Sequence, residues 1–493
     1  MRASLHPFAP LALAATLALA GCASTPPLDL AAVERSLGGE AATRLSIDAQ
    51  GRWYQFGQAP APGQAWPAFE LLRYHAELDF PAQAAQVQQT RRQIVEPGRA
   101  RPTPVDQQVD QAVLGAWAWN RAVAANGQPG AVSAQPAAVA ERQAELWSTP
   151  QGFVRAAREA GASISRDGAL TRVSFKTKTG VPYEGWINAQ GDLERVRTLV
   201  DSPVLGDTPL ETRFEQYRDF GGLRFPARVL RLQGGHPVLD LQVSQVRPGR
   251  AGGIEAPAEA RQTQSPAPKV EWKALASGVH YLTGGTHHSV LVEQRDHLVL
   301  VEAPQSEERS LALLAAIRER LPAKPVRYVI NTHAHFDHAG GLRTLVDAGA
   351  TVVTVAANKP FFEQAWAQPH TLNPDALSRS GRRAQFETFQ GRHVISDGQR
   401  RIELHELAGN GHNDAFALIY LPAEKIAIQA DAYNPGPTAT PPTGAPNPYT
   451  VNLLQNIERL GLQVEQIAPL HGPRTVTVAE LRTVTGEKSV AQR

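Results

Sequence analysis

Asn-Thr-His-Ala-His-Phe-Asp-His, residues 331–338, is the stretch that decides the fold of this chain. It brings four potential metal ligands into six consecutive positions: His333, His335, Asp337 and His338. The preceding segment 326–330 is largely β-branched and apolar, as in a buried strand, and the Gly-Gly bend that follows opens a helix. We therefore expect the ligands at the C-terminal end of a strand, where α/β sheets place their chemistry.

The spacing of these side chains suits two metal ions. His333 and His335 lie two residues apart in extended backbone, so their imidazoles project to the same side and can share one cation. Asp337 and His338 lie past the bend, point elsewhere and suit a second cation. Nitrogen and oxygen ligands together fit Zn²⁺ or a similar divalent metal. The alternative is a set of solvated loop histidines beside a capping aspartate.

Length and composition limit the domain organisation and the partners that the chain can have. A chain of 493 residues exceeds what one hydrophobic core organises, so two or three domains are expected. The formal net charge of +2 argues neither for nor against nucleic acid, and no run of Lys or Arg exceeds a couple of residues. We expect no nucleic-acid partner. Twelve of the fifteen histidines lie in residues 271–493, so the chemistry is expected there.

The N-terminus has the pattern of a lipoprotein signal peptide. Residues 1–21 combine Arg2 with a ten-residue Leu/Ala run that is too short to span a bilayer. Leu-Ala-Gly-Cys at 19–22 matches the bacterial lipobox, in which Cys22 becomes the lipidated first residue. Ala23 follows it and favours the outer membrane. We expect a lipid-anchored protein that faces the periplasm and has neither a disulfide nor a catalytic thiol, because Cys22 is the single cysteine.

The first half of the mature chain contains few groups that could carry chemistry. Residues 22–28 resemble a short tether, and residues 29–247 a strand-rich mixed α/β domain. Strand–turn units between 171 and 246 predict a meander of antiparallel strands with helices on one side. Helices are predicted near 107–124 and 136–160. We expect a scaffold or docking domain, with a lipid- or substrate-binding half-barrel as the alternative.

A linker separates this half from a second domain. Residues 248–270 are rich in Pro, Gly and Ala. From 271 to 493 strands and helices are both expected: strands at 279–282, 289–293 and 298–301 open the domain, and a helix at 307–321 that Ser306 caps follows them. Two β-rich halves, each flanked by helices, predict a four-layer αββα sandwich. The fold class expected for the whole chain is α+β, a strand-rich N-terminal domain followed by this sandwich.

Residues 271–493 resemble the metallo-β-lactamase-fold hydrolases. The resemblance rests on the motif at 333–338, on Gly-His at 411–412 after a strand, on Asp431 at the end of a strand, and on His-Gly at 471–472. It implies seven ligands for two metals: His333, His335 and His412 for the first, Asp337, His338 and His471 for the second, and Asp431 as the bridge.

The same resemblance implies a chemistry. Two divalent metal ions are expected, Zn²⁺ first, with Fe or Mn as alternatives. A metal-bridging hydroxide would attack an ester, thioester, lactone, amide or phosphoester-type bond of a small molecule, and Asp337 or Asp431 would carry the proton. His287 and His288 lie on a loop that faces the metal cleft in this fold, so both are candidate substrate contacts, as is Tyr433 beside the bridging acid.

Two departures from the family pattern bear on this reading. Asp431 stands where one β-lactamase subclass has a cysteine ligand, as in the family's thioesterases, lactonases and phosphodiesterases. Glu302 follows the strand 298–301 in place of the common aspartate, so a longer acid is expected to support the ligands. Two alternatives stay open, namely an iron-dependent oxidoreductase of the same fold and a lipoprotein carrier module with an accessory metal domain. The intact set of seven ligands favours the hydrolase.

Overall fold

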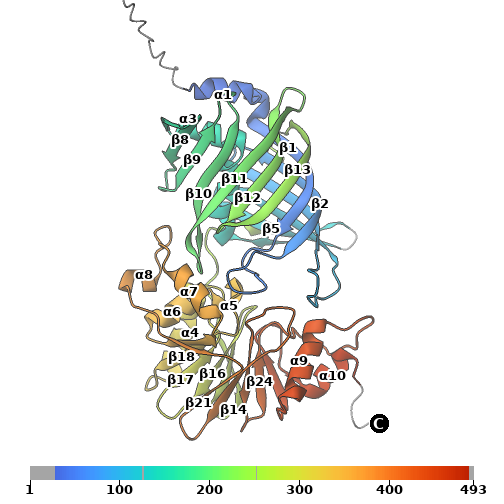
Figure 1. The fold of residues 1–493 in the computed structure, drawn as a ribbon, viewed down its shortest axis with the longest axis vertical. Helices are drawn as coiled ribbons and strands as arrows, with labels where there is room; N and C mark the ends of the chain where they lie inside the picture. The colour runs from blue at the N-terminus through green and yellow to red at the C-terminus, as the bar shows by residue number, and fades with distance from the viewer. Residues whose placement is uncertain (1–27, 125–126, 251, 488–493) are drawn as a thin grey trace, which may run out of the picture.

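The computed structural model describes residues 28–124, 127–250 and 252–487, which form two bodies stacked along the long axis of the molecule (Figure 1). We call residues 28–248 the sheet region and residues 271–487 the sandwich region. The predicted signal peptide and the predicted lipidation site Cys22 lie outside the described residues. Among the helices of the described part, none combines the length and the apolar character needed to cross a membrane.

One antiparallel sheet of thirteen strands builds the sheet region. Strands that follow each other in the chain are neighbours in the sheet, except β6 and β7, which form its two edges, and β1 pairs with β13 in the middle of the sheet. Its strands are β1 (Arg44–Tyr54), β2 (Ala68–Asp79), β3 (Ala84–Gln93), β4 (Asp106–Leu114), β5 (Trp117–Val123), β6 (Pro129–Ala134), β7 (Ser163–Asp167), β8 (Leu170–Lys176), β9 (Pro182–Ile187), β10 (Leu193–Ser202), β11 (Gly206–Asp219), β12 (Arg224–Gln233) and β13 (His236–Pro248).

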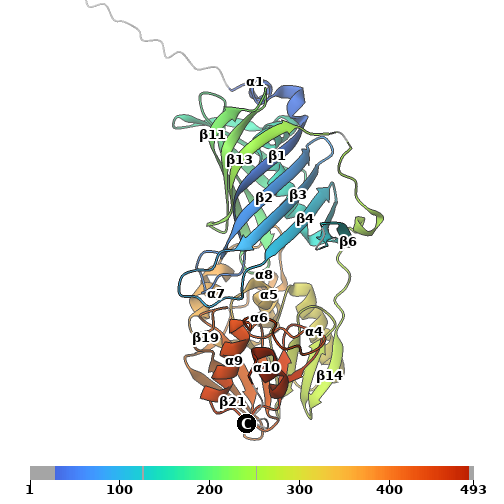
Figure 2. The ribbon, with the colours of Figure 1, turned by 90° about the vertical axis from the view of Figure 1, so that its right-hand side faces the viewer.

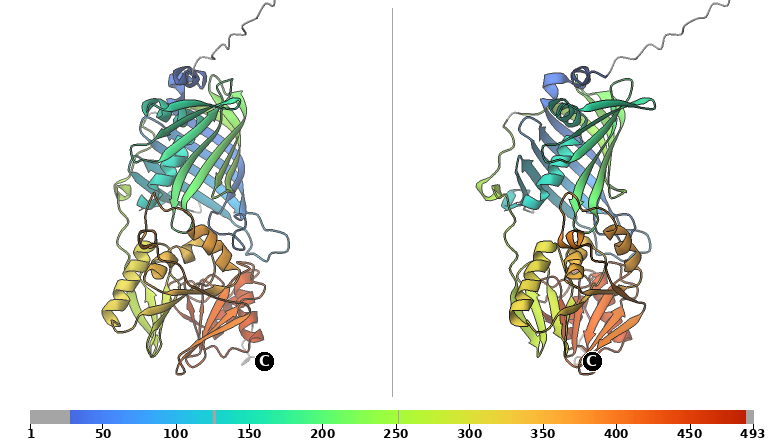
Figure 3. Two further views of the ribbon diagram at one scale, coloured as in Figure 1. Left: turned by 60° about the vertical axis from the view of Figure 1, so that its left-hand side comes forward. Right: turned by 90° about the vertical axis from the view of Figure 1, so that its left-hand side faces the viewer.

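The sheet curves around two helices, α2 (Val139–Trp147) and α3 (Pro150–Glu159) (Figure 3). Helix α2 contacts β3, β4 and β5 from one half of the sheet and β10 from the other half. Its side chains and those of α3 pack with inward-facing strand residues into one core, in which Leu146, Phe153 and Val154 are buried. Helix α1 (Leu30–Ser36) lies at the end of the sheet region farthest from the sandwich region (Figures 1 and 2).

The helix predicted near 107–124 is wrong, because these residues form the hairpin of β4 and β5. Gly115 takes a φ of +54° in the turn between them, a conformation that glycine adopts without steric cost. Trp119 then buries its ring against Ala256 and Ala260 of the predicted linker. The strand therefore gains a partner that lies more than a hundred residues away, which no local pattern reveals. The second predicted helix is present as α2 and α3, with Thr149 capping α3.

Two further sheets face each other in the sandwich region. The first contains β14 (Glu271–Ala276), β15 (Val279–Thr283), β16 (Ser289–Glu293), β17 (Leu298–Val301), β18 (Val326–Ile330), β19 (Thr351–Val355) and β20 (Phe386–Phe389). The second contains β21 (Arg392–Ser396), β22 (Arg401–Glu406), β23 (Ala417–Leu421), β24 (Ile426–Gln429), β25 (Gln466–Pro469) and β26 (Val476–Thr477).

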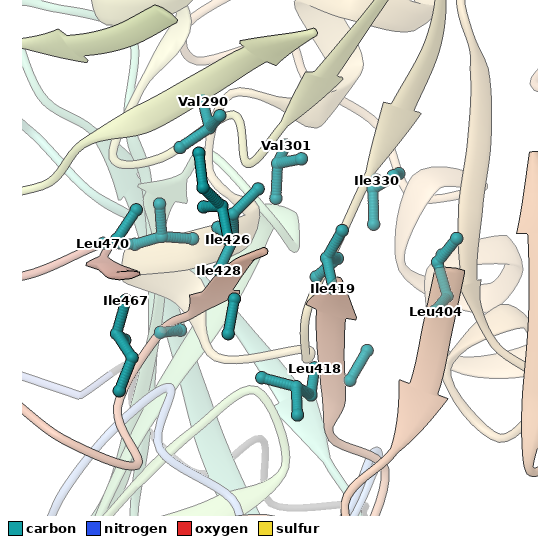
Figure 4. Packing of buried hydrophobic residues seen from close by; sticks show 14 of the residues in the cluster. Val290, Val301, Ile330, Leu404, Leu418, Ile419, Ile426, Ile428, Ile467 and Leu470 are labelled. Atoms are coloured by element: carbon teal, nitrogen blue, oxygen red, sulfur yellow. The ribbon is translucent and has the colours of Figure 1, made fainter. Parts of the chain in front are cut away.

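Strand β17 shows why the region is layered. Successive side chains of a strand point to opposite faces, so Val299 and Val301 enter the core between the two sheets, whereas Leu298 and Leu300 pack under helices. All four are fully buried because both faces are covered. Figure 4 shows Val290, Val301 and Ile330 of the first sheet close to residues of the second, such as Ile419 and Ile428.

Helices complete the outer layers. Those packed on the first sheet are α4 (Glu307–Arg320), α6 (Leu342–Asp347), α7 (Asn358–Trp366) and α8 (Ala376–Ser380), and those on the second are α9 (Pro448–Arg459) and α10 (Val478–Thr485). Ser306 caps α4 as predicted. The αββα sandwich and the strand-rich region before it are confirmed, and the two sheets leave their strand ends facing the sheet region (Figure 1).

Candidate metal centre

The motif at 331–338 follows β18, an inner strand of the first sheet, and the short helix α5 (Phe336–Ala339) begins inside it. Buried hydrogen bonds hold the turn. The Asn331 side chain donates to the carbonyl of His333 over 2.7 Å, and the backbone N–H of Thr332 donates to Glu302 over 2.6 Å. These bonds stabilise the turn that presents the ligand side chains at the C-terminal end of the strand.

Four predicted ligands come together in what we call the first ligand group: His333, His335, His412 and Asp431. One ligand atom from each lies within 4.8 Å of those of the others. The Nε2 atoms of His333 and His412 are 3.3 Å apart, and Asp431 Oδ2 is 3.1 Å from His412 Nε2. The donor atoms therefore converge on one point, as the ligands of a single cation do.

A second ligand group lies beside the first: His287, Asp337, His338 and His471. The Nε2 atoms of His338 and His471 are 3.0 Å apart, and Asp337 Oδ2 is 3.2 Å from His287 Nε2. The sequence suggested His287 as a substrate contact, but the structure places it among the donor atoms of this group. An isolated backbone bridge pairs it with His471, so the two histidines approach the same point from neighbouring loop segments.

Asp431 reaches both groups. Its Oδ2 lies 2.9 Å from His338 Nε2 and 3.1 Å from His412 Nε2, while its Oδ1 lies 3.1 Å from His471 Nε2. The residue lies two positions after the end of β24, so its side chain emerges at the end of the second sheet, opposite the motif on the first. It occupies the position that the sequence analysis expects of a bridging carboxylate.

The charge states of the buried ligands suit cation binding. Burial lowers the pKa of His333 to about 3 and that of His471 to about 4, so both imidazoles are neutral at pH 7. Burial would raise the pKa of Asp431, but the imidazoles of His338 and His412 outweigh it and hold this pKa well below its usual value. Asp431 is therefore ionised at pH 7.

His338 behaves differently from the other ligands because two carboxylates face its ring. Burial opposes its charge, yet Asp431 and Glu302 together hold its pKa well above the usual value. Glu302 accepts from His338 Nδ1 over 2.6 Å and is fully buried. This bond fixes the ring with Nε2 facing the second ligand group, as an acid behind a metal-ligating histidine does. The expected support by a longer acid is thus present in the geometry.

The sheet region also takes part in the site, through the loop of residues 55–67 between β1 and β2 (Figure 1). His335 donates from Nε2 to the carbonyl of Ala59 over 2.9 Å, and Asn413 donates to the same carbonyl over 3.1 Å. The other ring nitrogen of His335, Nδ1, is buried and has no hydrogen-bond partner among the described residues. The Nδ1 lone pair is therefore free to bind a metal ion.

The same loop contacts the second ligand group. Gln58 donates from its side-chain amide to Asp337 Oδ1 over 2.8 Å, and the backbone N–H of Phe336 donates to the carbonyl of Gly57 over 3.1 Å. Phe336 also packs edge-on against Phe56 and Trp66, with ring centroids 5.2 and 5.6 Å away. Sequence reasoning missed these contacts and assigned this half of the chain a scaffold role.

A second loop of the sheet region, residues 94–105, covers the other side of the site. Arg99 donates to the carbonyl of Gly411 and pairs with Asp414, while Arg101 donates to the hydroxyl of Tyr449. A side chain at Gly411 would collide with the carbonyl of the loop, at 1.8 Å from its Cβ. Only glycine fits there, which accounts for the Gly-His pair that delivers His412.

A cavity of about 380 Å³ opens beside the ligand groups, and we call it the metal-side cavity. Its lining consists of His412, Asp431, Tyr433, Asn434, Asn447, Tyr449, Thr450 and Val484. Tyr433, a predicted substrate contact, is therefore at its wall. His288, another predicted substrate contact, is not at the wall: it is buried against Tyr281 and donates from Nε2 to the carbonyl of Gly472. It supports the loop that carries His471.

The two groups fit a pair of divalent cations. Their donors are imidazole nitrogens and carboxylate oxygens, the set that Zn²⁺ and related metals prefer. Neighbouring Nε2 atoms 3.0 and 3.3 Å apart gain a shared partner when a cation lies between them. Together with the free Nδ1 of His335, this arrangement fits the expectation that the residues hold metal.

Comparisons with known proteins agree with this geometry. The family model of the metallo-beta-lactamase superfamily matches residues 282–466. A linear primary-alkylsulfatase of Pseudomonas sp. is 28% identical over 166 residues, 31% of this chain and 23% of that protein. An (R)-specific secondary-alkylsulfatase of Pseudomonas sp. is 32% identical over 94 residues, 18% of this chain and 14% of that protein. The chain thus spans less than a quarter of the length of these curated relatives.

A solved structure, a metallo-beta-lactamase from Pontibacter korlensis, is 19% identical with a TM-score of 0.35, and the match covers 44% of this chain and 98% of that one. The family match by itself contains all the donor residues of the two ligand groups except His471. Residues 282–466 therefore form a domain of the metallo-beta-lactamase superfamily.

Proposed function

We propose that this chain is a hydrolase that uses two divalent cations to cleave an ester-type bond of a small molecule. Zn²⁺ is the first candidate for these cations. The position of Asp431 carries the proposal. Its two oxygens face donors of both ligand groups, as a carboxylate shared by cations about 3.5–4 Å apart would. When bound, such cations lower the pKa of water toward about 7 and polarise the bond to be cleaved.

The protein's own groups then orient the reactants and move the proton. Gln58 and His287 hold the two oxygens of Asp337. Burial would raise the pKa of Asp337, but the hydrogen bond from His287 and the nearby His338 and His335 outweigh it and hold this pKa well below the usual value. The carboxylate is therefore ionised and fixed in direction. We assign it the transfer of the proton from the attacking water to the leaving group. Asp431 holds the two ligand groups in a fixed position relative to each other.

The metal-side cavity is the proposed place of the substrate. Tyr433 and Tyr449 offer apolar ring faces, and Asn434 and Asn447 offer amides, next to His412 and Asp431. A substrate with an apolar body and a polar ester fits such a lining. The two curated relatives act, by their names, on alkyl sulfates, so sulfate esters of alkyl chains are the first candidates.

The decisive experiment measures metal content and activity on the same preparation. We expect close to two divalent metals per chain and turnover of at least one member of a panel of alkyl sulfates, carboxylic esters, thioesters, lactones, β-lactams and phosphodiesters. His335→Ala should lose at least one metal and the activity. His393→Ala is the matched control, because His393 lies on β21 away from both ligand groups and pairs with Glu387.

Three results would contradict the proposal. A chain purified without chelator and free of metal would remove its basis. A chain that holds two irons and consumes O₂, yet cleaves no substrate of the panel, would favour the oxidoreductase alternative. A two-metal protein without turnover of any kind would favour the carrier module with an accessory metal domain.

We also propose that the protein is anchored to the outer membrane through a lipid on Cys22 and faces the periplasm. The lipobox at 19–22 supports this, and helix α1, the first described element, lies at the end of the molecule opposite the sandwich region (Figure 2). The anchor would hold the metal centre away from the bilayer. Labelled palmitate should enter the wild type and not Cys22→Ala; incorporation into both would refute the lipobox.

A further inference from the structure

The sheet region encloses a second cavity, far from the metal ligands in sequence, that the proposed hydrolysis does not use. It has a volume of about 340 Å³, within the range of small-ligand sites, about 300–1,000 Å³. It lies between helix α2 and the inner face of the curved sheet, with walls from β1 to β4, β12 and β13. We call it the sheet cavity.

Most of the wall is apolar. Ile47, Leu78, Val113, Leu239 and Leu241 line it, each on a different strand or two positions apart on the same strand, so their side chains share one face. All five are buried. A wall of this kind excludes water and favours a hydrocarbon group.

A polar cluster stands at one side of the cavity. Arg231 pairs with Glu145 of α2 over 2.7 Å, and Gln233 donates to Glu141 over 3.0 Å. Arg142 is fully engaged, since it donates to the carbonyls of Ala112 and Trp119 and to Asn120. The lining therefore holds two cations and two anions, and their formal charges balance.

Two buried polar atoms in this lining have no hydrogen-bond partner within the described ranges: the Nε of Arg231 and the Oε1 of Gln89. Arg231 is only 8% exposed. An unpartnered buried donor and an unpartnered buried acceptor each carry a desolvation penalty. A ligand that accepts from the first and donates to the second would remove both penalties.

We propose that the sheet cavity binds an uncharged single-chain amphiphile whose head group offers both a hydrogen-bond acceptor and a donor, such as a hydroxylated ester or an amide. The hydrocarbon chain would lie against the apolar wall and the head between Arg231 and Gln89. A charged head is disfavoured because the charges of the lining already balance. The proposal does not depend on metal in the sandwich region.

The full chain can be tested with the neutral fluorescent probe N-phenyl-1-naphthylamine. We expect saturable binding at one site per chain, reversed by 1-monolauroylglycerol, with at least tenfold weaker reversal by laurate and by dodecylammonium. The titration is done on chelator-treated and metal-loaded protein. If the two preparations bind the probe equally, the ligand lies outside the metal centre. A failure of the hydrolase proposal would then leave this result intact.

A pair of neighbouring variants locates the site. Ala138 lines the cavity, whereas Ala137 is exposed beside it. Ala138→Trp should weaken the binding of the probe by at least tenfold, and Ala137→Trp should bind the probe as the wild type does. Gln89→Leu removes the acceptor without adding bulk. It should weaken the binding of 1-monolauroylglycerol by about five- to tenfold, the usual effect of losing one hydrogen bond.

Three outcomes would overturn the proposal: no saturable binding by the wild type, equal binding by the two alanine variants, or equal reversal by the charged and the uncharged amphiphiles. If Ala138→Trp fails to fold, as its circular dichroism would reveal, Gln89→Leu decides. Its unchanged affinity for 1-monolauroylglycerol would then refute the head-group assignment.

Discussion

His335 Nε2 donates a 2.9 Å hydrogen bond to the backbone carbonyl of Ala59, across the boundary between the two regions of the chain. A metal-ligating imidazole needs its second nitrogen held by such an acceptor, which fixes the ring and its tautomer. Here the acceptor comes from a loop of the sheet region. The first half of the chain thus supplies a direct contact to the candidate metal centre.

The side chain next to Ala59 gives the first prediction. Gln58→Ala removes the donor to Asp337 Oδ1 and should weaken the binding of Zn²⁺ by about 10–100-fold, the usual effect of losing a partner of a metal ligand. Competition with a chromophoric chelator measures this affinity. Gln64→Ala is the control, since Gln64 is exposed on the same loop; equal affinities of the two variants would show that the loop does not support the site.

The two glycines of this loop offer a matched pair. Gly57 and Gly63 have φ values of +80° and +75°, so alanine at either position is strained by about 1–2 kcal/mol. A Cβ at Gly57 would lie 2.8 Å from the Phe336 ring, whereas a Cβ at Gly63 meets nothing within 4 Å. Gly57→Ala should therefore lower both stability and Zn²⁺ affinity, and Gly63→Ala stability alone. Thermal unfolding and chelator competition separate the two effects.

The two candidate catalytic carboxylates should respond differently to substitution. Asp431→Ala should disturb both cations and lower the midpoint of thermal unfolding, because a metal that binds only the folded state stabilises it. Asp337→Asn keeps an oxygen ligand but removes a proton carrier, so it should retain substantial metal and lose turnover by about 10²–10⁴-fold. Metal analysis and steady-state kinetics check both. Loss of one metal from Asp431→Ala with the other bound normally would argue against a bridge.

Metal binding should release a proton. His338 of the metal-free protein is protonated at pH 7, because Asp431 and Glu302 hold its pKa well above 6.5, and a cation at Nε2 requires the neutral ring. We expect about one proton from His338 per chain at pH 7. The release should fade as the pH rises through the raised pKa, where the metal-free ring is already neutral. Calorimetric titration with Zn²⁺ in two buffers of different ionisation enthalpy counts the protons, and Glu302→Gln should release fewer.

The sequence was sufficient to predict candidate ligands where these residues are close together in the chain. His333, His335, Asp337 and His338 could be predicted as ligands because a strand end and a bend bring them together without help from the rest of the fold. The support by Glu302 was also predictable, since it follows a recognisable strand. The sandwich itself follows from strands such as β17, whose four apolar residues need cover on both faces.

Other contacts depend on parts of the chain that no local pattern connects. Gln58 lies 279 residues before Asp337, in a Pro/Ala-rich segment that resembles any surface loop. His287 and His288 are neighbours of the same type, and only the pairing of His287 with His471 decides which of them enters the ligand group. The hairpin of β4 and β5 was mistaken for a helix because its stability comes from the strands and the linker around it.

The pairing of β1 with β13 in the middle of the sheet has a consequence for synthesis. Asp48 and Arg247, which are paired across these strands, are separated by 199 residues. At a synthesis rate of about 5–20 residues per second, β13 leaves the ribosome roughly 10–40 s after β1. During that time one of its edges is open, and the loop of Gln58 and Ala59 is attached to an unfinished sheet. Until β13 is made, the open edge of β1 can therefore pair with other strands, which the completed sheet prevents.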